Sequence, residues 1–540
     1  MLQGTQILVL KEGTERTRDK SATSNNIAAA RAIADAVRST LGPRGMDKML
    51  VDSMGDITIT NDGVTILKEV DVEHPAAKML VEVAKTQDQQ CGDGTTTAVV
   101  IAGELLKRSE SLLEQNVHPT VITRGFQLAV QEARRLLDAE IGIPVKADDE
   151  AVLIDCAMTA MGSKGVGGSR EELAKIAVRA VQRIADHQGG KIVCDVDQIK
   201  VEKRHGGQIS DTELIDGIVL DKERGHPRMP GEVVNAKIAL LNSALEVKKT
   251  EIESKINIKN PAQIQSFLDE EDKTFRQMAD AIKAVGANVV VCQKGIDDVV
   301  LHYLAKQGVY AVKQVKESDM QKLARATGGK IVTGIKELSA ADLGLAAKVD
   351  ERRVGDDKMT YVTGCSNPRS VSILIRGGTE HVTQEVERSL QDALKVVGSV
   401  IEDGVVCPGG GATEIDLAVK LRKWAGTVGG REQLAVEAFA QSLESIPWAL
   451  AENGGFDSIN VLIDLRSAHD GPNANKNVGL NLADGKATDM WKLHVIEPLR
   501  VKRQALSSAV EVATMLLRID DIIASRKSSP PPGGPGGHDH

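Results

Sequence analysis

The residue types best suited to phosphate chemistry stand together in the stretch Gly92-Asp93-Gly94-Thr95-Thr96-Thr97. Amphipathic segments at 75–88 and 95–113 flank it, which predicts a tight turn between two helices with the threonines on the first turn of the second. A helix N-terminus offers free N–H groups and partial positive charge to a phosphate, and Asp93 offers a carboxylate to Mg²⁺. An ordinary capped helix is the alternative, because Thr is a common N-cap.

Four further stretches contain residues that could serve the same chemistry. Each also has a simpler explanation, namely a helix stop, a turn, a flexible connector or a short strand before a helix. They are Gly42-Pro43 with the charged residues 44–48, Asn61-Asp62-Gly63, the glycine-rich loop 161–168 with its single Lys164, and Pro408-Gly409-Gly410-Gly411-Ala412. No Gly-Lys-Ser/Thr ending occurs at 92–97, so this is not a Walker A loop.

The composition indicates a globular protein that does not bind nucleic acid. The chain has 540 residues, 41% hydrophobic and 26% charged, and a net charge of -9 with acids and bases interspersed. Its length suggests about three domains. Aromatic residues make up only 2% of the chain, so its core must be aliphatic.

The cysteines and the apolar runs bear on the compartment. The six cysteines are scattered and form no C-x-x-C pair, which predicts reduced thiols in the cytoplasm and no structural zinc. The N-terminus resembles no signal peptide, and no apolar run approaches the ~18 residues of a membrane span.

The elements that must position these residues differ along the chain. Helical patterns dominate from residue 23 to 185 and from 379 to 523, with a predicted hairpin at 49–60 that needs a partner edge. Between 190 and 375, short apolar runs alternate with helical segments, which predicts a parallel sheet with crossover helices. Residues 245–280 read as an exposed helical excursion from that sheet domain, and residues 1–22 as a loose arm.

Four motifs occur together and in a fixed order: residues 41–50, 60–67, 92–97 and 408–412. In this combination the chain resembles a group II chaperonin subunit of the archaeal thermosome type, from about residue 5 to 525. The resemblance implies a multidomain α+β and α/β fold. A mainly helical equatorial ATP-binding domain would comprise 1–149 and 404–526, an intermediate hinge domain 150–217 and 370–403, and an α/β apical substrate-binding domain 218–369. The excursion at 245–280 would be a lid protrusion, and 527–540 a disordered tail.

The resemblance also assigns roles to individual residues. Asp93 would ligate Mg²⁺, and Asp62 and Asp392 would orient or activate the attacking water. Helical periodicity alone places Asp392 on a polar face, as a surface acid. Lys164 would sense the γ-phosphate. The residues implied to contact the nucleotide are Leu41, Gly42, Pro43, Asp93, Gly94, Thr95, Thr96, Thr97, Ser163, Lys164, Gly410, Gly411, Leu482, Ala483, Glu497 and Lys502.

The implied activity is that of an ATP-dependent molecular chaperone with ATP and Mg²⁺ as cofactors. The partners would be copies of the chain and paralogous subunits, in two stacked rings of about eight or nine, and unfolded client proteins, with no separate co-chaperonin lid. Two other classes stay open: a small-molecule kinase, which would need an acceptor pocket, and a ring scaffold without turnover, against which the intact Asp62, Asp93 and Asp392 argue.

Overall fold

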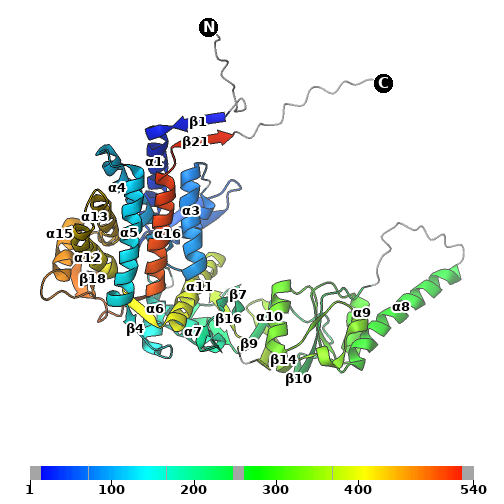
Figure 1. Cartoon of the computed structure of the whole chain (residues 1–540). Coiled ribbons are helices and arrows are strands. Elements are labelled where there is room, and N and C mark those ends of the chain that lie inside the picture. Colours follow the sequence, from blue (N-terminus) through cyan, green and yellow to red (C-terminus); the bar gives the residue numbers. More distant parts are fainter. Residues whose placement is uncertain (1–13, 71, 166, 247–260, 368, 526–540) are drawn as a thin grey trace, which may run out of the picture. The chain divides into compact units, whose positions relative to one another are not determined.

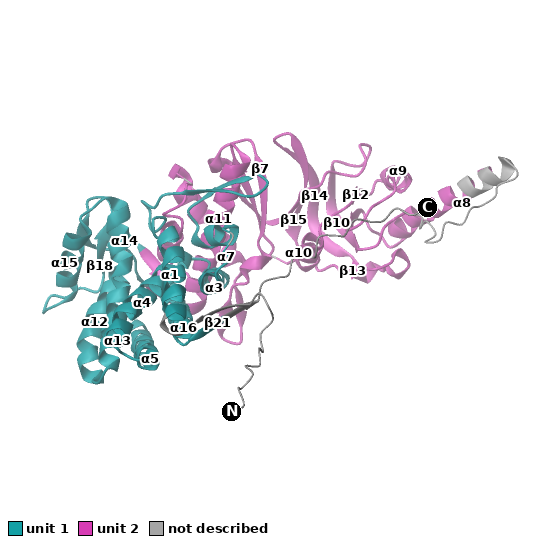
Figure 2. Cartoon of the chain, turned by 90° about the horizontal axis from the view of Figure 1, so that it is seen from above, with its two compact units in different colours: residues 1–142, 407–495, 499–540 teal, residues 143–406, 496–498 magenta. Residues whose placement is uncertain are grey.

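The computed structural model describes residues 14–70, 72–165, 167–246, 261–367 and 369–525 (Figure 1). Its contacts divide the chain into two compact units, coloured separately in Figure 2. Unit 1 comprises 1–142, 407–495 and 499–540, and unit 2 comprises 143–406 and 496–498. Unit 1 is therefore assembled from both ends of the chain, and most of unit 2 is one continuous segment.

Unit 1 is a bundle of helices with an aliphatic core. Its central helix, α4, buries most of its side chains because apolar and small residues occupy nearly all its faces, as expected for a helix surrounded by others. Its helices are α1 (Asp19–Arg38), α2 (Gly63–Glu69), α3 (Pro75–Cys91), α4 (Thr95–Glu114), α5 (Pro119–Leu136), α12 (Ala412–Val428), α13 (Glu432–Leu443), α14 (Ser445–Gly454), α15 (Ser458–His469) and α16 (Leu499–Leu517).

Three two-stranded antiparallel sheets complete unit 1. They pair β1 (Thr14–Arg18) with β21 (Asp521–Ser525), β2 (Lys48–Val51) with β3 (Ile57–Thr60), and β18 (Val478–Asn481) with β19 (Lys486–Asp489). The predicted hairpin at 49–60 is confirmed. The loose arm expected at 1–22 is wrong for residues 14–22, because β1 finds its partner strand about 500 residues away, and α1 already begins at Asp19.

The larger part of unit 2 is a seven-stranded sheet with helices packed on it. The strand order is β12-β11-β10-β14-β15-β9, with β13 also paired to β10. Strands β10, β11, β12 and β13 pair in parallel, which confirms the predicted parallel sheet with crossover helices for this part. The sheet as a whole is mixed, because β14, β15 and β9 join it by antiparallel pairing. The elements are β9 (Gly217–Leu220), β10 (Glu232–Leu241), α8 (Pro261–Ala284), β11 (Val289–Cys292), α9 (Asp298–Lys306), β12 (Tyr310–Val312), α10 (Glu317–Thr327), β13 (Ile331–Val332), β14 (Gly344–Val354) and β15 (Asp357–Cys365).

The rest of unit 2 consists of three helices and short sheets. Its elements are β4 (Ile143–Pro144), α6 (Glu150–Ala160), α7 (Arg170–Ile184), β5 (Asp186–Gln188), β6 (Lys191–Val193), β7 (Lys200–His205), β8 (Glu213–Ile215), β16 (Ser372–Gly377), α11 (Glu380–Asp403), β20 (Ile496–Pro498) and the first half of β17 (Val405–Pro408), whose last two residues belong to unit 1. Strand β16 lies between β7 and β8. The buried Ser372 hydroxyl donates to Gly217 O at 2.8 Å, which ties this smaller sheet to the start of β9. The predicted division of unit 2 into intermediate and apical domains stays a prediction.

The predicted multidomain fold, mainly helical in one part and α/β in another, is confirmed. Of the predicted lid protrusion, residues 247–260 lie outside the described residues, and α8 supplies 261–284; the predicted tail at 527–540 also lies outside them. In the part of the chain that the structure describes, no helix is both long and apolar enough to cross a membrane.

The tight crossing of α1 and α4 gives a test of this packing. A Cβ added at Gly103 would lie 2.3 Å from Ala34 Cβ, so Gly103→Ala must force the two helices apart. We expect Gly103→Ala to lower the free energy of unfolding by about 1–3 kcal/mol and the melting temperature by a few degrees, measured by differential scanning fluorimetry.

Gly426→Ala is the matched control within unit 1. Gly426 lies in α12 and a Cβ there would meet no atom within 4 Å, so this change should leave stability unaltered or raise it by about 0.5–1 kcal/mol. An equal fall in melting temperature for both variants would contradict the packing described.

Candidate nucleotide-binding site

The turn between α3 and α4 has the geometry that the sequence predicts. Gly92 ends α3 with φ 74° and Gly94 precedes α4 with φ 77°, both in the left-handed region that favours glycine. Between them, the Asp93 carboxylate accepts a hydrogen bond from Gly94 N at 2.6 Å. The Asp93 carbonyl accepts from the buried Gln87 Nε2 at 2.9 Å, and the same Nε2 donates to Val501 O at 3.2 Å. Gln87 therefore fixes the turn against α16.

The turn that contains Asp62 and Gly63 lies directly against the first turn of α4. A Cβ added at Gly63 would stand 2.5 Å from Thr96 Oγ1 and 3.2 Å from Thr96 N, so only glycine permits this approach. Asp62, one residue earlier, caps α2: its Oδ2 accepts from Thr65 N at 3.0 Å and from Thr65 Oγ1 at 2.6 Å. Asp62 and the α4 N-terminus are thereby brought together, although 32 residues separate Asp62 from Thr95 in the sequence.

The segment Leu41-Gly42-Pro43 is held by a residue of α14, which lies far from it in the sequence. Asn453 Nδ2 donates to Leu41 O at 2.9 Å and to Arg38 O at 3.1 Å. Gly42 has φ 82°, and a Cβ on it would lie 3.9 Å from Leu482 Cδ1. Gly42 and Leu482, both predicted to contact the nucleotide, are therefore neighbours within unit 1.

The triple glycine after β17 meets the hairpin that carries Leu482 and Ala483. Leu480 N donates to Gly410 O at 2.9 Å, and a Cβ at Gly410 would stand 2.5 Å from Met490 Sδ. Gly410 and Gly411 have φ of 61° and 78°. The close approach inferred from these glycines is thus an approach to the backbone and side chains of the β18–β19 hairpin.

Lys502 is buried in α16 and paired. Its Nζ lies 2.9 Å from Oε1 of Glu414, which is the third residue of α12 and is itself buried. A buried ammonium and carboxylate need each other, because either charge alone would be costly to desolvate. Lys502 is therefore held beside the start of the helix that follows the triple glycine.

The remaining predicted residues lie in unit 2. Lys164 Nζ stands 2.6 Å from Asp392 Oδ2, and the two side chains are only 4% and 15% exposed. Asp392 is thus not the surface acid that helical periodicity alone suggests, because the loop between α6 and α7 covers it. Ser163 precedes Lys164 in that loop. Glu497 lies in β20, whose Ile496 N donates to Thr159 Oγ1 at 3.3 Å.

Sequence reasoning missed several of the residues that organise these contacts. Gln87, Glu414 and Asn453 carry no local signal, except that Asn453 precedes two glycines and so marks a turn. Gly63 was recognisable as a turn residue, but its approach to Thr96 was not. In the described ranges no group of three or more His, Cys, Asp or Glu could hold a metal ion by itself.

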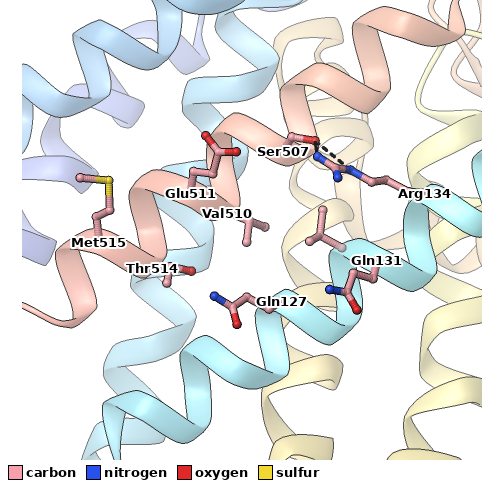
Figure 3. Close-up of a pocket in the computed structure, with 9 residues that line it drawn as sticks. Gln127, Gln131, Arg134, Ser507, Val510, Glu511, Thr514 and Met515 are labelled. Atoms are coloured by element: carbon pink, nitrogen blue, oxygen red, sulfur yellow. Dashed lines mark hydrogen bonds between the residues drawn. The ribbon is translucent and has the colours of Figure 1, made fainter.

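A separate cavity of about 560 Å³ lies in unit 1 between α5 and α16 (Figure 3). Arg134 and Ser507 are joined across it by two hydrogen bonds, and the buried Thr514 hydroxyl is without a hydrogen-bond partner. None of its nine lining residues is a predicted nucleotide contact. This cavity is therefore not the predicted site.

Comparisons with known proteins agree with the resemblance. The model of the TCP-1/cpn60 chaperonin family matches residues 33–527. The chain is 59% identical to thermosome subunit alpha of Thermoplasma acidophilum over 98% of this chain and 96% of that protein, and 55% identical to thermosome subunit beta of the same organism over 97% and 96%. A solved structure, the open state monomer of a group II chaperonin from Methanococcoides burtonii, matches with a TM-score of 0.62 at 46% identity, covering 79% of this chain and 100% of that one. The chain belongs to the TCP-1/cpn60 chaperonin family, and the predicted likeness to group II chaperonins is confirmed.

Proposed function

We propose that this chaperonin subunit binds and hydrolyses ATP, and that the cycle drives a double-ring cage to enclose and fold non-native proteins. The single observation that carries the proposal is the approach of Gly63 to the first turn of α4. It brings a helix N-terminus with three threonines and two carboxylate turns into one place, which is the combination that phosphoryl transfer needs.

The triphosphate would lie on the N-terminus of α4. Gly42, Gly94 and Thr95 to Thr97 would surround the phosphates, and Asp93 would bind Mg²⁺ as it enters with the nucleotide. The donor set fits that ion, because Mg²⁺ commonly takes one or two protein carboxylates and completes its shell with phosphate oxygens and water. Bound there, Mg²⁺ would neutralise phosphate charge.

The nucleoside would lie beside the triple glycine. Gly410 and Gly411 permit a close approach, Leu482 and Ala483 offer backbone and apolar contact, and Lys502 and Glu497 would supply polar contacts. The direct contact between Gly410 and the β18–β19 hairpin supports this placement of the nucleoside, since both elements would be needed around one base and ribose. Leu41, Pro43 and Ser163 would complete the enclosure.

Hydrolysis would need a carboxylate that positions water in line with the γ-phosphate. We assign this to Asp392, with Asp62 as the second orienting carboxylate and Lys164 as the sensor of the γ-phosphate. The ion pair between Lys164 and Asp392 supports a linked role for the two residues. Because both lie in unit 2, hydrolysis would depend on the conformation of that unit as well as on binding.

Assembly into rings would use the β2–β3 hairpin. Its cross-strand pairs Met49–Ile59 and Val51–Ile57 lie on one face, and all four side chains are exposed. An exposed apolar face on a two-stranded sheet favours contact with another chain. Alpha and beta thermosome subunits in one organism support a ring that mixes paralogous subunits. The excursion that contains α8 would act as the lid of the cage. The compartment would be the cytoplasm.

The role of Asp392 is tested with Asp392→Asn, which keeps a hydrogen-bond partner for the buried Lys164. We expect ATP binding to be retained and hydrolysis without any added acceptor to fall about a hundredfold, measured by calorimetry and by phosphate release. Gln391→Ala, an exposed change on the same helix, should leave both unaltered. Normal turnover in Asp392→Asn would remove the assignment, and a need for an acceptor in the wild type would favour a kinase.

The role of the hairpin is tested by light scattering with and without Mg-ATP. Sixteen copies of the 57.7 kDa chain come to about 920 kDa. We expect the double variant Met49→Lys, Ile57→Lys to yield a far smaller particle, because it places two charges on the apolar face. Thr58→Lys, on the opposite face of the same hairpin, should assemble normally. An intact large particle in the double variant would exclude the hairpin as the ring contact.

A further inference from the structure

A buried histidine links three elements of unit 1 without being one of the predicted nucleotide contacts. His469 is the last residue of α15, and its side chain is fully buried. Its Nε2 lies 2.7 Å from Val478 O, at the start of β18, and its Nδ1 lies 3.2 Å from Asp416 Oδ1 in α12. The ring therefore spans from α12 to the strand that leads to Leu482.

Both ring nitrogens lie within hydrogen-bond distance of an oxygen atom, Nε2 of a carbonyl and Nδ1 of a carboxyl group. The Val478 carbonyl can only accept, which makes Nε2–H a donor. Burial alone would raise the pKa of Asp416, but hydrogen bonds from His469 and Lys420 outweigh it and hold that pKa below its ordinary value. Asp416 is therefore a carboxylate, and it lies between the His469 ring and the Lys420 ammonium group.

Polar contacts continue outward from this pair. Lys420 Nζ lies 2.8 Å from Asp416 Oδ2 and 3.0 Å from Glu140 Oε2, so the lysine bridges two carboxylates. Lys476, two residues before Val478, donates to Glu140 O and Ile141 O at 2.8 and 3.1 Å. The beginning of β18 is thus attached at two points: His469 connects it to α12, and Lys476 connects it to the backbone at Glu140 and Ile141.

The far end of β18 meets the triple glycine. Leu480 N donates to Gly410 O, Leu482 Cδ1 would lie 3.9 Å from a Cβ at Gly42, and Leu482 Cδ2 would lie 3.1 Å from one at Gly454. Strand β18 is only four residues long, so Leu480 and Leu482 follow Val478 by only two and four residues. A four-residue strand in a two-stranded sheet is marginal without such anchors.

We infer that His469 is a positioning residue for nucleotide binding. Its hydrogen bond to the Val478 carbonyl fixes the start of β18 and thereby holds Leu482 and Ala483 in the place where a nucleoside would contact them. The inference rests on the proposed function, since it assumes that this hairpin meets the nucleotide. Because His469 would act through Val478 and touch no substrate, its loss should weaken ATP binding and leave the hydrolytic step intact.

The test compares His469→Phe, which removes both ring nitrogens at similar size, with His469→Gln, which can keep one hydrogen bond. We expect the KM for ATP to rise about tenfold in His469→Phe, as a charge-assisted hydrogen bond would predict, and less in His469→Gln, with kcat within about twofold of the wild type. Hydrogen exchange, followed by mass spectrometry on the intact assembly, should be faster at the amide of Leu480.

Phe439→Leu is the control for a general loss of stability, because it truncates a fully buried ring in α13. It should lower the melting temperature and leave the KM for ATP unchanged. An unchanged KM in His469→Phe, or an equal rise in Phe439→Leu, would overturn the inference. Absence of ATP turnover in the wild-type chain would instead overturn the proposed function. Turnover of the wild-type chain is therefore measured before any variant is compared.

Discussion

The close approach of several backbone segments to the first turn of α4 is the constraint on which the rest of the site depends. A helix N-terminus attracts a phosphate only if its N–H groups are reachable and other donors converge on the same space. At Gly63 and Gly94 an added Cβ would stand 2.5 Å from Thr96 Oγ1 and 2.6 Å from Val501 Cγ1. A side chain at Gly63 would therefore displace the turn of Asp62 from α4, and a side chain at Gly94 would collide with α16.

Paired charges stabilise the surroundings of this cradle. Lys502 with Glu414 and Lys164 with Asp392 are buried pairs whose members come from elements far apart in the sequence. In a medium of low dielectric, each charge is tolerable only beside its partner, so the pairs fix the relative positions of their elements within each unit. In the proposed site, a triphosphate would compete with these carboxylates for the two lysines. Nucleotide binding would therefore be coupled to the contacts that hold the elements in place.

The sequence predicts the local parts of this arrangement well and the distant contacts poorly. The turn at 92–94, the hairpin at 49–60 and the parallel pairing after residue 288 follow from glycines, periodicity and strand length, which are local properties. The pairing of β1 with β21 and the burial of Asp392 depend on partners hundreds of residues away, and nothing in the neighbouring residues specifies them. The roles assigned to individual site residues came from the family likeness, because an aspartate at a helix cap looks the same whether or not it serves chemistry.

The connectivity of the chain sets the order in which the site can form. Unit 2 is almost wholly contained in one segment, so it can fold as soon as residues 143–406 are available. Unit 1 cannot, because Gln87 must reach Val501 and Leu41 must meet Asn453 before the turns around α4 are fixed. Such long loops must close against their entropy before the contacts form, which makes this half slow to complete. We therefore expect the proposed nucleotide cradle to form late in folding, because its turn at Asp93 is fixed through Gln87 to Val501 of α16.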